Sequence, residues 1–186
     1  MERYPYNSGE VESLISKVSD VQLHGSYYFL VLSGKYKGGK NAFLSKLSKR
    51  AGEISTVDLR SVISTNEEES YTYLDRLFDS LGEKNKIIYL EYGDVLSGEY
   101  TGFTYSTVRY ATPQEKYLLN KIQHSEKVVI LDLRDKANLT KSMERLAQAA
   151  IDFDAPDSGL SKLFWKLKQI RVNGHTFENK RPLDVR

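Results

Sequence analysis

The sequence predicts an α/β domain whose parallel sheet, of about five strands, is covered by helices on both faces. Strand-like and helix-like segments alternate along most of the 186 residues, as in strand–helix–strand units. The strand-like runs are almost continuously apolar, which is typical of parallel strands buried on both faces. A glycine-rich turn, Gly34 to Lys40, separates the first such run from the helix-like segment that follows.

The first half of the chain shows these patterns clearly. Val11, Leu14, Ile15 and Val18 recur on one helical face, and Gly52 provides a stop for a later helix. The predicted elements here are a helix over 7–20, a strand over 27–32, a helix over 42–51 and a short alternating strand over 54–59.

The second half repeats the alternation. Three glutamates, Glu67 to Glu69, predict the start of a helix, because negative charge is favourable at the positive end of the helix dipole. The apolar run 86–91 ends at the acid Glu91. Buried parallel strands deliver such terminal residues to the carboxyl edge of the sheet. The predicted elements are a helix over 67–81, a strand over 86–91, a surface loop over 95–108, a helix around Tyr117–Ile122, a strand over 127–131, a helix over about 140–149 and a last strand over 151–153.

Composition excludes several classes of protein. The chain is 40% hydrophobic and 28% charged, with a net charge of +2 and no cysteine, so disulfides and thiolate metal sites are excluded. No run approaches the roughly 20 apolar residues of a membrane span, and the first residues lack the apolar core of a signal peptide. We expect a soluble, cytoplasmic protein without a membrane partner, and the near-neutral charge disfavours nucleic acid.

The glycine-rich turn has the spacing G-x-x-x-x-G-K of a phosphate-binding loop, with Asn41 where that motif calls for Ser or Thr. A strand before it and a helix after it provide the context that this motif requires. Backbone N–H groups of such a loop and the N-terminus of the helix form an anion site, and the lysine reaches the terminal phosphates. The predicted nucleotide-binding residues are Gly34, Gly38, Gly39, Lys40 and Asn41.

The order of these features resembles the core domain of AAA-type P-loop ATPases, in particular AAA proteins of contractile injection systems, which are phage-tail-like machines. The resemblance spans about residues 27–156 and is carried by 57–64, 94–98, 129–131 and 152–156 as well as by the loop. It implies a three-layer P-loop NTPase fold. The predicted division is an N-terminal helix and extension over 1–26, the AAA-like core over 27–156 and a basic helix and tail over 157–186, too short for the lid domain of that family.

The resemblance also implies which groups would act on a nucleotide, and the sequence departs from the family at those places. Asn41 lies where the family has the hydroxyl that binds Mg²⁺. Glu91 occupies the position of the aspartate in the Walker B strand. Tyr92 stands for the glutamate that polarises water; a phenol is a poor general base near neutral pH, and we expect Tyr92 to be a packing residue. Arg145 falls on an arginine-finger position, and Asp94 follows the Walker B residues.

These departures predict a pseudo-ATPase that binds ATP or ADP, with Mg²⁺ near Glu91 and Asn41, and acts as a scaffold in assembly of a contractile injection apparatus. Glu91, Asp94 and Arg145 are the catalytic candidates. Two alternatives stay open: a slow but active ATPase, and an interaction module with a vestigial loop. Partners would be further copies or an intact AAA protein in a ring, or a protein bound by the basic C-terminal helix or the 97–108 loop.

Overall fold

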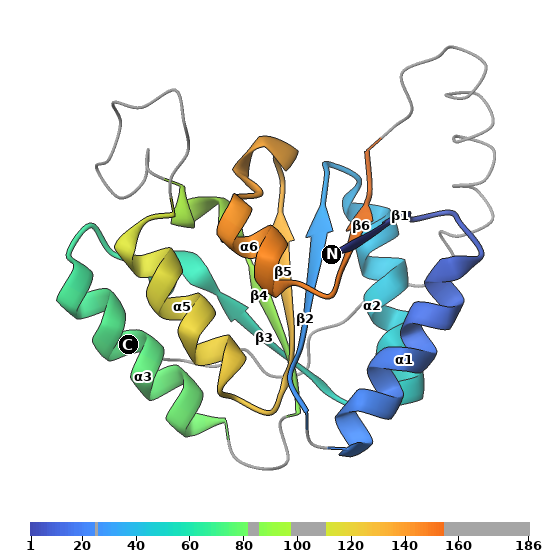
Figure 1. Cartoon of the computed structure of the whole chain (residues 1–186), viewed down its shortest axis with the longest axis horizontal. Helices are drawn as coiled ribbons and strands as arrows, with labels where there is room; N and C mark the ends of the chain where they lie inside the picture. Colours follow the sequence, from blue (N-terminus) through green and yellow to red (C-terminus); the bar gives the residue numbers. More distant parts are fainter. Residues whose placement is uncertain (25, 82–85, 98–110, 155–186) are drawn as a thin grey trace.

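The computed structural model describes residues 1–24, 26–81, 86–97 and 111–154. Figure 1 shows a central sheet with helices on both sides. The strands are β1 (Glu2–Pro5), β2 (Tyr28–Ser33), β3 (Ile54–Asp58), β4 (Ile87–Glu91), β5 (Val128–Leu133) and β6 (Ala149–Asp152). The helices are α1 (Glu10–His24), α2 (Lys37–Ala51), α3 (Glu67–Ser80), α5 (Pro113–Gln123) and α6 (Lys141–Leu146), with short 3-10 turns η1 (Leu59–Ser61), η2 (Gly93–Leu96) and η3 (Lys136–Asn138).

The sheet has the strand order β1-β6-β2-β5-β4-β3, and all of its neighbouring strands run parallel. This confirms the predicted α/β fold with a parallel sheet. The sixth strand was not predicted: β1 pairs with β6 from Glu2 opposite Ala149 to Pro5 opposite Asp152. Its residues are mostly exposed, so they carry no apolar signal, and Pro5 is tolerated because β1 is an edge strand.

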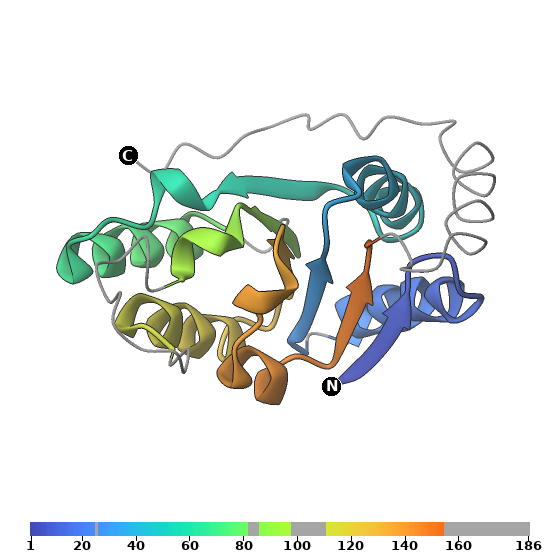
Figure 2. The same ribbon diagram turned by 90° about the horizontal axis from the view of Figure 1, so that it is seen from above.

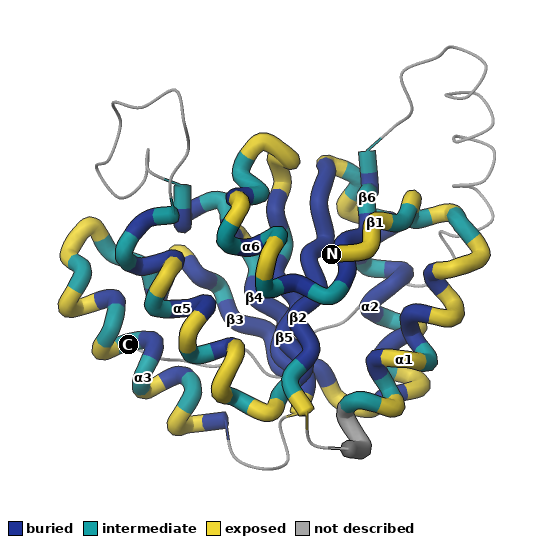
Figure 3. The backbone as a smooth tube through the Cα atoms, viewed as in Figure 1, coloured by how far each residue is buried: buried dark blue, intermediate teal, exposed yellow. Residues whose placement is uncertain are grey.

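Alternate residues of each strand enter two separate cores, which makes the fold three-layered. On β2, Leu30 and Leu32 pack with α1 and α2, whereas Phe29 and Val31 pack with α3, α5 and α6. Figure 2 shows the two helix groups on opposite sides of the sheet, and Figure 3 shows the buried strands between them. In the described part of the chain no helix is both long and apolar enough to cross a membrane.

The 97–108 loop falls almost entirely, and the 157–186 segment entirely, outside the described residues. The predictions made for them therefore remain predictions.

Candidate functional site

The glycine-rich loop is anchored to the carboxyl ends of β5 and β6. Gly34 donates its N–H to the carbonyl of Leu133 at 3.0 Å, and Tyr36 donates to that of Phe153 at 3.1 Å. The N–H of Lys35 donates to a carboxylate oxygen of Asp154 at 3.0 Å. Gly34 has a φ of +110°, a conformation that favours glycine. The loop therefore leaves the sheet along a fixed path.

The helix after the loop begins at Lys37 rather than at Ala42, so Gly38 and Gly39 lie in its first turn. The N–H of Lys40 already donates to the carbonyl of Tyr36, at 3.3 Å. The ring of Tyr36 lies against Gly39, where a Cβ atom would come within 2.5 Å of it. The first-turn N–H groups of a helix point along its axis and can bind an anion, and those of Gly38 and Gly39 lie in this first turn.

Lys40 lies at the carboxyl edge of the sheet and is only 4% exposed. Its Nζ donates to one carboxylate oxygen of Asp132 and, at 3.0 Å, to the carbonyl of Leu133. The hydroxyl of Tyr89 donates to the other oxygen of Asp132 at 2.9 Å. Asp132 thus compensates the charge of Lys40. Sequence reasoning missed it, although an acid inside the apolar run of β5 was a visible signal.

Glu91 ends β4 at the same edge. Burial raises the pKa of its carboxyl group, and the nearby charge of Lys37 opposes that shift. Glu91 therefore interacts electrostatically with the start of the helix that carries Lys40. Asn41, the second predicted Mg²⁺ ligand, is half-buried in the first turn of α2. Within the described ranges, no group of three or more His, Cys, Asp or Glu side chains could hold a metal ion.

Tyr92 follows Glu91 and has a left-handed backbone with φ of 60°. Its side chain is 41% exposed, and the guanidinium of Arg60 lies 3.6 Å from its ring centre. Arg60 is in turn held by the carboxylate of Asp58 through its Nε, at 2.9 Å. Tyr92 therefore packs against an arginine rather than against the core, and it supplies no carboxylate at the position of the family's general base.

Asp94 and Arg145 are the two remaining catalytic candidates. Both carboxylate oxygens of Asp94 hold the turn after β5: they accept from the N–H groups of Arg134 and Asp135, at 2.7 and 3.0 Å, and from the side chain of Asn138 at 2.7 Å. Asp94 is therefore engaged in a structural contact. Arg145 is exposed on α6, where it lines a hollow with Arg3 and other residues outside the loop.

A cavity of about 280 Å³ adjoins the first turn of α2 and was not predicted. Tyr6 and Phe153 stack in its wall with ring centres 5.4 Å apart, and burial raises the pKa of the Tyr6 hydroxyl to about 12. The cavity is lined by Tyr6, Asn7, Ser8, Val11, Glu12, Gly39, Ala42, Phe43, Lys46 and Phe153. It therefore places aromatic rings beside the glycine that precedes Lys40.

Comparison with protein-family models and with curated proteins finds no match. Among solved structures, 93 chains match. One of them is the crystal structure of the FIGL-1 AAA domain in complex with ADP, with a TM-score of 0.54 and 11% sequence identity, over 84% of this chain. The match spans 57% of the length of that chain, and at this identity it shows the fold alone. With its parallel sheet, its strand–loop–helix segment around Lys40 and this structural neighbour, the chain has an AAA-type P-loop NTPase fold.

Proposed function

We propose that this chain is a nucleotide-binding domain of AAA type that holds ATP or ADP and does not turn it over. One observation carries the proposal: Gly39, in the first turn of α2, lines the aromatic cavity and directly precedes Lys40. A volume of about 280 Å³ lies near the lower end, ~300 Å³, of small-ligand pockets. The solved neighbour contains ADP, which supports the same ligand class.

In this arrangement the phosphates would bind at Gly38, Gly39 and Lys40, with the exposed side chains of Lys35 and Lys37 adding positive charge at the mouth. The base would enter the cavity beside the stacked rings of Tyr6 and Phe153. Because Lys40 already donates to Asp132 and to the carbonyl of Leu133, a phosphate oxygen would take the third N–H of its Nζ or replace the Asp132 carboxylate there. Mg²⁺ keeps several waters and takes ligands from phosphates, so Glu91 and Asn41 would supply at most a small part of its shell.

The absence of turnover follows from the groups around the loop. Hydrolysis requires a base near the attacking water, and Tyr92 presents an aromatic face to Arg60 at the family's position for that base. Asp94 already accepts three hydrogen bonds. The role as a scaffold in a contractile injection apparatus, with copies or an intact AAA protein as partners, is supported only by the sequence segments that resemble that family.

A second candidate function is an interaction module whose loop no longer binds nucleotide. The buried pair of Lys40 and Asp132 favours it, because the charge of the lysine is already compensated and two of its three N–H groups already have acceptors without a ligand.

Isothermal titration of the whole chain with ATP and with ADP, in Mg²⁺, tests the proposal. Lys40→Ala is expected to weaken binding about 10- to 100-fold, since a hydrogen bond to a charged group is worth about 1.5–3 kcal/mol. Lys49→Ala, at the exposed end of the same helix, is the matched control and leaves affinity unchanged. If millimolar nucleotide produced no binding heat with the unaltered chain, the interaction module would be the better description.

A phosphate-release assay tests the second half of the proposal. We expect no ATP-dependent release above background with the unaltered chain, because Tyr92, a phenol, stands at the family's position for the general base. Lys40→Ala is the control that separates real turnover from a contaminating ATPase. Release that disappears in the Lys40 variant would show that the slow-ATPase alternative is correct.

A further inference from the structure

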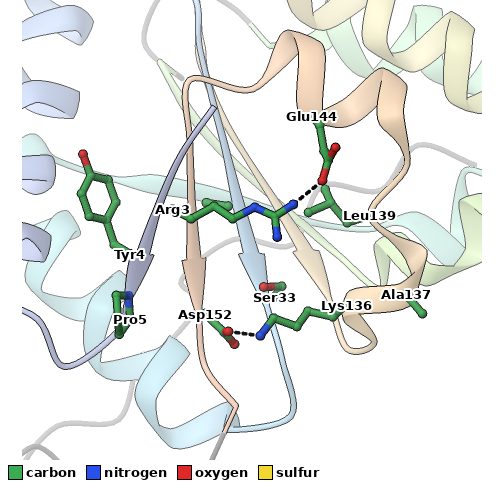
Figure 4. A pocket seen from close by; sticks show the side chains of 10 residues that line it. Arg3, Tyr4, Pro5, Ser33, Lys136, Ala137, Leu139, Glu144 and Asp152 are labelled. Carbon is green, nitrogen blue, oxygen red and sulfur yellow. Dashed lines mark hydrogen bonds and ion pairs between the residues drawn. The ribbon is translucent and has the colours of Figure 1, made fainter. Parts of the chain in front are cut away.

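A larger hollow, of about 500 Å³, lies on the α6 side of the sheet between β1 and the η3–α6 segment (Figure 4). It contains none of the residues of the loop from Gly34 to Asn41. Its walls come from both ends of the described chain: they are Arg3, Tyr4, Pro5, Ser33, Lys136, Ala137, Leu139, Glu144, Ala150 and Asp152. Residues that are far apart in the sequence therefore form this hollow, and no local sequence motif predicts it.

Two ion pairs flank this hollow. Arg3 pairs with Glu144 and Lys136 pairs with Asp152, and Figure 4 shows Ser33 between the two pairs. A carboxylate oxygen of Asp154, which does not line the hollow, also lies 4.0 Å from the Nζ of Lys136. The four side chains are 34–58% exposed. Ion pairs this exposed contribute only about 0–1 kcal/mol each. A carboxylate from outside can therefore replace Glu144 or Asp152 at little cost.

Positive charge exceeds negative charge along the surface. A second hollow, of about 380 Å³, shares Arg3 and Glu144 with the first and adds Met1, Lys141 and Arg145. We call the two hollows together the β1–α6 groove. Its cationic side chains are Arg3, Lys136, Lys141 and Arg145, against the two carboxylates Glu144 and Asp152. An anionic occupant is complementary to this surface.

The floor between the charged rims is small or apolar. Ser33 is 3% exposed and Ala150 is 4% exposed, and Pro5 and Leu139 stand on either side. This leaves room for an apolar side chain between the two cations. In the described sheet β1 pairs only with β6, so the groove opens at the sheet edge, where an extended segment can enter.

The geometry points to the β1–α6 groove as the docking site for an acidic peptide segment of a protein partner, in which an apolar residue is flanked by Asp or Glu. The apolar side chain fills the hollow over Ala150. Acidic side chains on either side replace Glu144 at Arg3 and Asp152 at Lys136. In an extended segment the residues at positions i−2, i and i+2 face the same side, so acids two positions before and after the apolar residue enter the groove together with it.

Fluorescence anisotropy with two labelled, end-capped pentapeptides tests this inference on the whole chain: Glu-Asp-Leu-Asp-Glu and its amide counterpart Gln-Asn-Leu-Asn-Gln. The acidic peptide is expected to bind at least about tenfold more tightly, because charge-assisted hydrogen bonds are the stronger kind. The double variant R3Q/K136Q is expected to lose about tenfold or more. Arg76→Gln, an exposed arginine of α3, is the matched control and stays within about twofold.

A variant that is expected to bind the peptide more tightly separates the inference from a loss of binding caused by misfolding. Glu144→Gln removes the internal competitor for Arg3 and is expected to tighten the acidic peptide about threefold, in keeping with the modest value of an exposed pair. Equal binding of both peptides, or no change in R3Q/K136Q, would overturn the inference. Full displacement by inorganic phosphate at constant ionic strength would do the same, since the groove would then be a simple anion site. Lys40→Ala should leave peptide affinity unchanged.

Discussion

Gly34→Ala is expected to lower the free energy of unfolding by about 3 kcal/mol, from a left-handed backbone penalty of roughly 1–2 kcal/mol and an overpacking cost of similar size. Gly34 has a φ of +110°, and a Cβ atom there would lie 2.7 Å from the backbone N of Asp154 and the carbonyl carbon of Phe153. These are backbone atoms at the end of β6, so no side-chain rotation can relieve the contact. Urea denaturation with a constant slope measures the change.

Gly52→Ala is the matched control for this prediction. Its φ is +100°, yet nothing lies within 4 Å of the position of its Cβ. It therefore carries the backbone penalty without the clash, and we expect a loss of only about 1–2 kcal/mol. Equal losses in the two variants would contradict this prediction. They would show that the backbone at the end of β6 moves to accommodate the Cβ atom at position 34 at no measurable cost in stability.

Glu115→Gln is expected to remove a pH dependence of stability worth roughly 3 kcal/mol. Glu115 is 1% exposed in the first turn of α5 and accepts a hydrogen bond from the hydroxyl of Thr140, which also caps α6. Burial raises the pKa of Glu115 from 4.5 to about 7, against the lowering effect of the Thr140 hydrogen bond and of the Lys116 charge.

The sign follows from proton binding. Between pH 4.5 and about 7 the folded state keeps a proton on Glu115 that the unfolded state has lost. The contribution of this group to stability is therefore fully present below pH 4.5 and is lost as the pH rises through 7. In urea titrations from pH 4.5 to 8, the stability of the unaltered chain relative to Glu115→Gln should fall by roughly 3 kcal/mol.

Glu68→Gln, an exposed first-turn position of α3, is the control and is expected to change stability by no more than about 0.5 kcal/mol. A difference between the unaltered chain and Glu115→Gln that did not vary with pH would mean that water reaches the carboxylate despite its burial.

Much of the architecture could be predicted from local patterns. Apolar runs such as 86–91 predicted buried parallel strands, and the run ending at Leu32 followed by glycines and a helix predicted the strand–loop–helix around Lys40. The start of α2 was predicted too late, because Gly38 and Gly39 have low helix propensity. The loop instead closes on the ends of β5 and β6, and these contacts allow the helix to start at Lys37.

Local sequence patterns were enough to predict the α/β class, the alternation of helices and strands, and the position of the phosphate-loop motif, because periodicity reports which face of each element is buried. The contacts between distant residues became visible in the folded chain alone. In the folded chain Lys40 pairs with Asp132, and Glu115 accepts a hydrogen bond from Thr140. Strand β1 pairs with β6, and the β1–α6 groove lies between β1 and α6. The physical reason is the same in each case: the partners lie far apart in the chain, and a local pattern encodes burial but not the identity of a distant neighbour.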